Sequence, residues 1–373
     1  MHAQLRDLTQ GPLAKQILLF SLPLIASNLL QVLFNMSDVA VVGRFAGSVA
    51  LGAVGSTTTL VTLFTGFIIG MSNGVNVLTA LHFGAKSRRE LSDTIHSAIL
   101  ICLGTGLILM VVGVGFARPI LELLNTKEEL IDGAALYLRI YFLGMPALGL
   151  YNFGNAVFSA VGDTRRPLRY LSLAGVVNIV LNLFFVIVCG MDVAGVATAS
   201  VIAQYLSAGL VVTALFRSHD EMYGLHFLRL RLHRSRSRAI LSIGLPAGMQ
   251  YGIFALANLF IQMGVNSFDA TMVAGNSAAA NEDALIYDVM AAFYTACGSF
   301  IGQNYGARQK DRVRRSYLIS MAYSFGIGTA MGLAILAVGP SFLSLFTEDP
   351  AVVDAGMKRL TCSPPRAPSS TQA

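Results

Sequence analysis

Nine long apolar segments constrain the fold of this chain more than any other feature of its sequence. Each segment has about 20 residues or more, which is the length at which an α-helix crosses a hydrocarbon core of roughly 30 Å. Backbone amides in lipid must find hydrogen-bond partners within their own helix, so we predict an all-α polytopic membrane protein. The segments cover about residues 14–43, 49–80, 94–116, 134–160, 169–190, 193–216, 239–266, 271–302 and 316–339.

Composition excludes an ordinary soluble domain. Hydrophobic residues make up 54% of the 373 residues and charged residues only 12%, whereas soluble proteins carry about 25% charged residues. Three of the four cysteines, Cys102, Cys189 and Cys297, lie within or at the ends of apolar segments, so a disulfide framework is not indicated. The polar N-terminus lacks the pattern of a cleavable signal peptide, so the first helix is retained. We recognise no metal cluster and no nucleotide-binding loop, and we therefore predict no cofactor and no metal.

Basic residues lie on alternate loops, and this pattern predicts the orientation in the membrane. Lys and Arg concentrate on the cytoplasmic side of membrane proteins. We therefore place the N-terminus in the cytoplasm and the protein in the cell membrane, the inner membrane in a bacterium. The same clusters account for the formal net charge of +6 without a nucleic-acid partner. The basic loops read GAKSRREL from residue 84, GDTRRPLR from 162, LRLRLHRSRSR from 228 and GARQKDRVRR from 306.

The two halves of the chain resemble each other at a spacing of about 222 residues. A unit of six helices has been duplicated, and because six is even, both copies enter the membrane from the same side. We predict a first lobe over residues 1–217, a cytoplasmic basic linker over 218–238 and a second lobe over 239–361. The matching pairs are SLPLIASNLLQVLFN with GLPAGMQYGIFALAN, ALHFGAKSRREL with GQNYGARQKDRV, and RPILELLNTKEELIDGA with GPSFLSLFTEDPAVVDAG.

The second copy of the repeat is incomplete. Its match with the first copy continues through DAGMKRLT and is then replaced by CSPPRAPSSTQA, whose prolines cannot continue a membrane helix. We expect a frameshift or premature end after about Thr361, a second lobe with three helices, and a disordered tail over residues 362–373. One alternative to a transporter is therefore a membrane protein that no longer transports.

An aspartate, Asp38, interrupts the first apolar segment in the stretch FNMSDVAVVGRFAG. A carboxylate at membrane depth is costly unless it faces polar groups, and such residues are usually functional. Counting 1.5 Å per residue along the helix places Asp38 near the outer edge of the hydrocarbon. An interfacial aspartate that reaches water or pairs with Arg44 is therefore an alternative to a functional carboxyl.

Residues from about Leu8 to Thr361 resemble the multidrug and toxic compound extrusion (MATE) family of transporters. The resemblance lies in GPLAKQILLFSLPLIASNLLQVLFNMSDVAVVGRFAG, in the pair HFGAKSRREL and QNYGARQKDRV, in YLRIYFLGMPALGLYNFGNAVFSAVGDTRRPL, and in VVNIVLNLFFVIVCGMDVAGVATAS. It implies a two-lobed helical fold, which would act as a monomer when complete, and not an enzyme. It also implies antiport, in which organic compounds, often cationic and amphipathic, are exported in exchange for H⁺ or Na⁺.

The resemblance also implies a cation-coupling site in the first lobe. Asp38 matches the aspartate that binds the coupling cation in this family, and Pro23 matches a proline that permits bending of the first helix. Four further residues match the polar network around that aspartate: Tyr137, Asn178, Asn182 and Ser200. Some family members carry an aspartate where this chain has Asn182, which leaves the coupling stoichiometry open.

The second lobe carries its own acidic residues. Glu282, Asp283 and Asp288 lie in the eighth apolar segment, and at 100° per residue they do not share one helix face. Asp283 best matches an acidic position of the family, and we predict a cation-binding or substrate-binding site here.

Two functions other than drug transport also have to be compared with the sequence. GMSNG at residues 70–74 fits the G-x-S-x-G pattern of serine hydrolases, but Gly66, Gly70 and Gly74 read better as a face for close helix packing. A lipid-linked sugar flippase has a similar architecture, but its cavity should be ringed with arginines, and Arg139 is the main arginine within a span.

Overall fold

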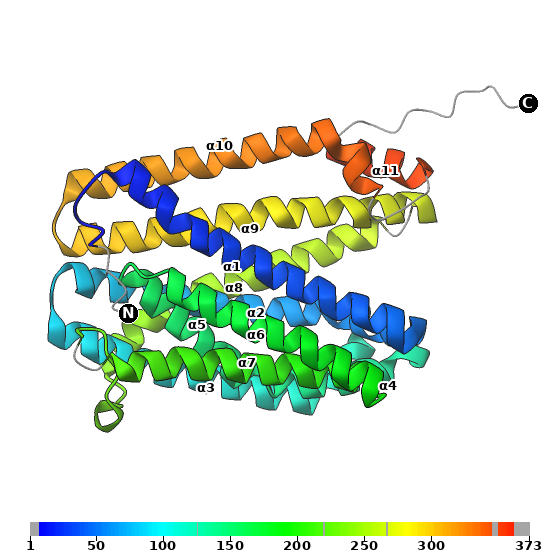
Figure 1. The fold of residues 1–373 in the computed structure, drawn as a ribbon, viewed down its shortest axis with the longest axis horizontal. Helices are drawn as coiled ribbons and strands as arrows, with labels where there is room; N and C mark the ends of the chain where they lie inside the picture. The colour runs from blue at the N-terminus through cyan, green and yellow to red at the C-terminus, as the bar shows by residue number, and fades with distance from the viewer. Residues whose placement is uncertain (1–6, 125, 219–220, 266–267, 345–349, 362–373) are drawn as a thin grey trace, which may run out of the picture.

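The apolar segments form helices in the computed structural model, which describes residues 7–124, 126–218, 221–265, 268–344 and 350–361. The predicted tail over residues 362–373 lies outside the described part. The helices run roughly parallel and form one elongated bundle (Figure 1). Their bounds are α1 Leu13–Val41, η1 Val42–Ala46, α2 Gly47–Gly84, α3 Arg88–Leu123, α4 Glu128–Phe142, α5 Met145–Ala160, α6 Arg165–Leu183, η2 Phe184–Val188, α7 Asp192–Arg217, η3 Phe227–Arg229, α8 Arg234–Val265, α9 Ala270–Gly306, α10 Lys310–Leu343 and α11 Pro350–Leu360.

Nine spans are confirmed when one bent pair is counted as a single span. Within the described residues, 8 helices are long and apolar enough to cross a membrane, and α4 and α5 together provide the ninth with a bend of 47°. The break falls at Leu143 and Gly144, just before Pro146. Pro146 has no backbone N–H to donate to Phe142, so the helix cannot continue unbroken through this point.

The outer surface of the bundle is apolar along its length. Ile108 and Val111 of α3 are 65% and 66% exposed, and Phe325 of α10 is 75% exposed. Large apolar side chains with this exposure would be unfavourable in water, whereas lipid chains cover them.

The first helix of each repeat packs partly or mostly against the other repeat. The N-terminal half of α1 packs on α9 and α10, and α8 packs on α2 and α3. Figure 1 shows α1 crossing from α10 at one end of the bundle toward α6 at the other. A cluster of apolar side chains fixes this crossing, and Phe20 of α1 meets Phe300 of α9 edge to face at 5.5 Å.

The glycine face predicted on α2 is a packing face. A Cβ added at Gly66 would lie 2.9 Å from the Tyr251 ring of α8, and one at Gly74 would lie 2.5 Å from the Ile240 carbonyl oxygen. Gly70 lies equally close to the backbone of α8. Ser72, the serine of GMSNG, is buried and donates its hydroxyl to the Ile68 carbonyl at 3.0 Å.

The turns that carry the basic loops lie together at one end of the bundle, which we call the basic end. It comprises residues 85–87, 161–164, 218, 221–233 and 307–309, where α2, α5, α7 and α9 end. At this end α2 and α9 touch through glycine: a Cβ at Gly84 would overlap the carbonyl of Gln303, and one at Gly306 would overlap the carbonyl of Leu81.

This contact predicts a strong difference between two glycine substitutions. Gly84→Ala should destabilise the protein by about 1 to 3 kcal/mol, because the added methyl forces two helix backbones apart. Gly104→Ala is the control, since a Cβ there has open space within 4 Å and alanine favours a helix by roughly 1 kcal/mol. Apparent melting temperatures in detergent measure the difference, and equal values for the two variants would contradict the packing described.

Candidate functional site

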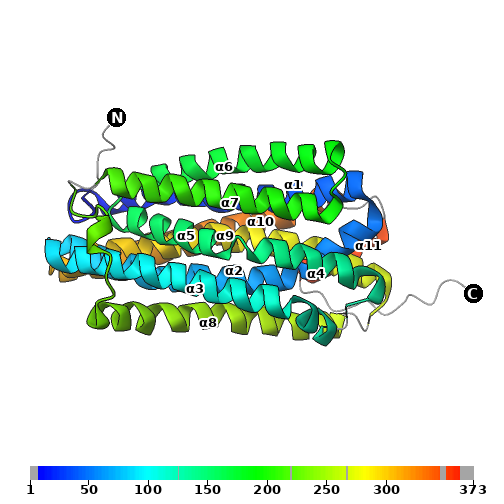
Figure 2. The same cartoon turned by 90° about the horizontal axis from the view of Figure 1, so that it is seen from below.

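Asp38 is buried near the end of α1 that lies away from the basic end. Its side chain is 8% exposed. One carboxylate oxygen accepts a hydrogen bond from Asn182 Nδ2, and the other accepts from Ser200 Oγ at 2.9 Å. The carboxyl is therefore held by side chains of α6 and α7; α6 packs against α1, and α7 packs against α6 (Figure 2).

Asn178 and Asn182 extend this network along α6. They stand four residues apart, so their side chains lie on one helix face. Asn182 Nδ2 also lies 3.3 Å from Asn178 Oδ1, and Asn178 Nδ2 donates to Ser200 Oγ at 3.2 Å. Ser200 thus accepts from Asn178 and donates to Asp38, which fixes the direction of its hydroxyl. The structure brings together four of the residues that the sequence placed in the site.

Oxygen atoms dominate the interior of this network. Besides the two carboxylate oxygens, the Oδ1 atom of Asn182 is buried and has no hydrogen-bond partner. Carboxylate and amide oxygens are the ligands that small hard cations prefer, and a carboxyl can instead hold a proton. The hydrogen-bond donors to Asp38 are neutral.

Two tyrosines of α4 form the wall of the site. Tyr137 and Tyr141 are buried and stack with their ring centres 5.9 Å apart, and both lie within electrostatic range of Asp38. Tyr137 was predicted from the sequence. Tyr141 was missed, although its position one helix turn after Tyr137 is the signal that could have identified it.

Two π-helical turns adjoin the site. η1 begins at Val42, one turn after Asp38, and η2 begins at Phe184, two residues after Asn182, and the two contact each other. A π-helical turn inserts an extra residue and changes the direction of the side chains that follow, and such turns occur often at functional sites. The sequence analysis did not predict either of them.

Pro23 lies inside a continuous helix. α1 runs from Leu13 to Val41 without a break. Thr164 donates its hydroxyl to the Phe20 carbonyl at 3.2 Å, and Ser27 donates to the Pro23 carbonyl at 2.9 Å. Side chains thus supply extra hydrogen bonds to the part of α1 where proline removes a backbone donor.

The predicted acids of the second lobe lie in α9, and the structure describes the side chain of one of them. The side chains of Glu282 and Asp283 are outside the described part. Asp288 is half-buried, and its backbone carbonyl accepts from Asn28 Nδ2 at 2.8 Å. Tyr251 of α8 lies within electrostatic range of Tyr287, Asp288 and Tyr294 of α9.

The arginines considered in the sequence analysis lie at the surface. Arg44 is an exposed residue of η1, and Arg139 is an exposed residue near the end of α4. The two oxygens of Asp38 instead accept from Asn182 and Ser200. The carboxyl is therefore neither at a water interface nor paired with Arg44 in this structure.

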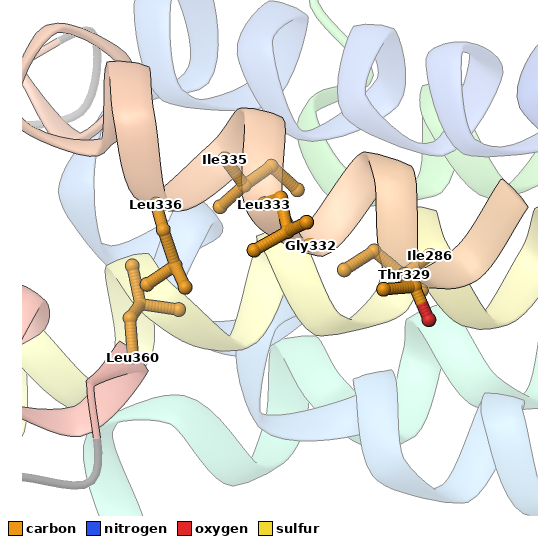
Figure 3. A pocket seen from close by; sticks show the side chains of 7 residues that line it. All are labelled: Ile286, Thr329, Gly332, Leu333, Ile335, Leu336 and Leu360. Carbon is orange, nitrogen blue, oxygen red and sulfur yellow. The ribbon is translucent and has the colours of Figure 1, made fainter. Parts of the chain in front are cut away.

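An apolar cavity of about 270 Å³ lies elsewhere, between α9, α10 and α11. Figure 3 shows its lining, in which Thr329 provides a hydroxyl. The cavity is distant in the chain from the Asp38 site and lies within the second lobe. It is lined by Ile286, Thr329, Gly332, Leu333, Ile335, Leu336 and Leu360.

Comparisons with known proteins agree with this fold. The MatE family model matches residues 23–184 and 246–363. A probable multidrug resistance protein of Bacillus subtilis, YpnP, is 29% identical over 354 residues, which cover 95% of this chain and 79% of that protein. The FAD transporter of Shewanella oneidensis is 24% identical over 351 residues, with coverage of 93% and 77%.

A solved structure has the same fold. It is described as the outward-facing conformation of a multidrug resistance MATE family transporter of the MOP superfamily. It matches with a TM-score of 0.88 at 22% sequence identity, and the match covers 96% of this chain and 80% of that one.

The helical fold and these relatives define a multi-pass membrane transporter of drugs or other xenobiotics. Within that class, the chain belongs to the MatE family, as the sequence resemblance predicted.

The hydrogen-bond network predicts that Ser200 matters more to stability than its neighbour Thr198. Ser200→Ala should cost about 1 to 3 kcal/mol, because Asp38 loses a donor and Asn178 loses an acceptor in a buried site. Thr198→Ala should be nearly neutral, since the Thr198 hydroxyl bonds only the Ala194 carbonyl of its own helix at 2.7 Å. Thermal unfolding in detergent at neutral pH compares the two, and a larger loss for Thr198→Ala would contradict the network.

Proposed function

We propose that this protein is an antiporter that exports organic, cationic and amphipathic drugs or metabolites in exchange for H⁺ or Na⁺. The observation that carries the proposal is the buried Asp38 carboxyl, which neutral donors surround within a membrane span. A buried carboxylate without a fixed counter-charge is costly in lipid, and binding one cation removes that cost. The carboxyl can therefore take up a cation on one side of the membrane and release it on the other.

The other first-lobe residues have distinct roles in this proposal. Asn178, Asn182 and Ser200 hold the carboxyl in one orientation and provide oxygen atoms for a bound ion. Tyr137 closes the site from α4, and Pro23 allows α1 to bend as the carboxyl gains or loses its cation. Because residue 182 is an amide, we propose that this site carries one positive charge in each cycle.

The aromatic residues near Asp288 suggest the substrate class. Tyr251 of α8 lies within electrostatic range of this carboxyl and of Tyr287 and Tyr294 on α9. An aromatic ring beside an acid favours an organic ammonium through cation–π attraction. The sequence adds Glu282 and Asp283 to the same helix, and we propose that this acidic part of α9 binds cationic compounds. A flavin nucleotide, the substrate named for the Shewanella relative, carries phosphates that these acids would repel.

We further propose the orientation and the division into lobes. The basic end faces the cytoplasm, together with the N-terminus, because arginines and lysines concentrate there. Residues 1–217 form the first lobe, 218–238 the linker and 239–361 the second lobe. The substrate passes between the lobes, and one copy of the chain is the working unit.

Asp38→Asn is expected to abolish efflux driven by an ion gradient, because an amide neither cycles a proton nor neutralises Na⁺. The assay follows a cationic dye and a flavin nucleotide in cells under separately imposed proton and sodium gradients. We expect dye efflux from the unsubstituted protein under one of the two gradients, and background efflux from the variant.

The matched control for this experiment is Asp132→Asn. Asp132 is an exposed acid whose partner is Arg118 at 2.9 Å, so its loss should leave efflux and membrane insertion unchanged. Full gradient-driven efflux by Asp38→Asn would refute the proposed coupling role. Flavin nucleotide export without dye export would refute the proposed substrate class.

The proposed orientation predicts opposite labelling of two cysteines. Cys189 is exposed and lies at the end of η2, away from the basic end, so an impermeant maleimide should label it from outside intact cells. Ser235→Cys, placed in a Cys189→Ala background, lies at the basic end and should react only after the cells are opened. Labelling of residue 235 from outside intact cells would contradict the proposed topology.

A further inference from the structure

The contact between α2 and α9 is close to two-fold symmetric. Under the repeat spacing of about 222 residues, Ala80 corresponds to Gly302. These two residues meet each other, since a Cβ at Gly302 would lie 2.6 Å from the Ala80 Cβ. Gly84 corresponds to Gly306, and each lies against the helix of the other. The axis that relates the two repeats therefore passes through this contact.

A polar pair lies on the same contact, deeper in the membrane. Asn76 Nδ2 donates to Ser299 Oγ at 3.1 Å and to the Ala156 carbonyl at 3.1 Å. Ser299 is fully buried there. Any movement that opens the basic end between α2 and α9 would expose Ser299.

The segment before α1, residues 7–11, is bound by the second repeat. We call it the first arm. Leu8 is fully buried, its N–H donates to Gln303 Oε1 at 3.1 Å, and its carbonyl accepts from Asn304 and from Arg312. Arg312 also donates to the Gly11 carbonyl at 3.0 Å. Each partner lies at the end of α9 or the start of α10.

Gln303 connects the first arm to the first repeat as well. Its Nε2 donates to the Ala160 carbonyl at the end of α5 at 2.6 Å. One side chain of α9 therefore bonds both the first arm and α5, and this arrangement holds only while the two halves are together at the basic end.

The segment before α8, residues 225–233, is bound by the first repeat in the same way. We call it the second arm. The His226 N–H donates to His96 Nε2 at 3.0 Å, and the His233 N–H donates to Ser97 Oγ at 3.0 Å. His233 also lies 3.4 Å from the Asp93 carboxylate. These three partners all belong to α3.

An ion-pair cluster fastens the start of α8 just after the second arm. Arg236 donates to Glu90 at 2.7 Å and faces His82 Nε2 at 3.3 Å. Because arginine has no acceptor, Nε2 of His82 carries the lone pair. His82 Nδ1 then carries the proton and donates to Glu90 at 3.2 Å. The three side chains come from α2, α3 and α8.

Each of the two arms is bound by the repeat other than the one whose first helix it precedes. The first arm binds α9 and α10, and the second arm binds α3. Arg236, just after the second arm, adds the contact with His82 of α2. The positions correspond as well, because Glu90 aligns with Arg312 and His82 with Asn304. The chemistry has diverged: Glu90 accepts from an arginine, whereas Arg312 donates to backbone carbonyls.

We propose that the two arms and the α2–α9 contact form a reciprocal clasp that keeps the basic end closed and must open in each transport cycle. The proposal rests on the transport function proposed above and names gating residues outside the cation site: Glu90, Arg236, Gln303 and Arg312. Glu90 is 44% exposed and Arg236 is 25% exposed. An ion pair with this access to water is weak enough to break repeatedly.

The clasp is tested by the reactivity of Ser299→Cys toward a soluble maleimide in purified protein in nanodiscs, with the native cysteines replaced by serine or alanine. With the clasp intact, we expect slow modification, because residue 299 is covered by α2. Glu90→Gln or Arg312→Gln should speed it about fivefold, which corresponds to about 1 kcal/mol of lost stabilisation of the closed state.

Two further variants make the test specific. Arg118→Gln removes an ion pair at the opposite end, with Glu122 at 3.0 Å and Asp132 at 2.9 Å, and should leave the rate unchanged. The double variant Glu90→Arg with Arg236→Glu keeps the ion pair with its charges exchanged. His82 can still bond both side chains in its other neutral tautomer, in which Nε2 donates to the carboxylate at position 236 and Nδ1 accepts from the guanidinium at position 90. This exchange should restore slow modification.

Unchanged rates of maleimide modification in Glu90→Gln and Arg312→Gln would overturn the clasp, because these contacts would then have no effect on the opening of the basic end. Faster rates that the charge exchange does not restore would also overturn it, because general loosening would then explain them. The measurement needs no gradient, so it is separate from the efflux assay. A positive result here together with full efflux by Asp38→Asn would reject the coupling proposal and keep the clasp.

Discussion

Close contact between helix backbones is the constraint on which the rest of this structure depends. In lipid, apolar side chains gain little by associating with one another, so helices pack where small residues let their backbones approach. α2 provides such faces toward both α8 and α9, through Gly74 and Gly84 among others. Because α8 and α9 belong to the second repeat, α2 is a main junction between the halves of the molecule.

The duplication has kept the scaffold and changed the chemistry. Pro23 and Pro246 occupy matching places in α1 and α8. Asp38, in contrast, corresponds to Ile261 at a spacing of 223 residues, and Ile261 is 62% exposed. Helix packing constrains both copies equally, whereas a buried carboxyl is costly and persists only where a network satisfies it. The result is a symmetric frame that holds an asymmetric arrangement of charge.

Sequence periodicity predicted the spans and the glycine face well, because the length of apolar segments and the spacing of small residues are local properties. Asp38 was identified as a carboxyl at membrane depth, and the family resemblance added Asn178, Asn182 and Ser200; these four side chains lie in contact. The sequence could not predict the bend before Pro146, the π-helical turns or the burial of Leu8. These features depend on contacts between residues far apart in the chain, and a single sequence carries no record of such contacts.

The first arm also bears on how the protein is made. Leu8 is synthesised before its partners Gln303 and Arg312, which follow 295 and 304 residues later. Contacts at this separation form late, because the intervening chain must be brought together first. The start of α1 therefore remains without its partners while most of the chain enters the membrane. α1 therefore leaves the ribosome before α9 and α10, yet it reaches its final place only after they have been inserted.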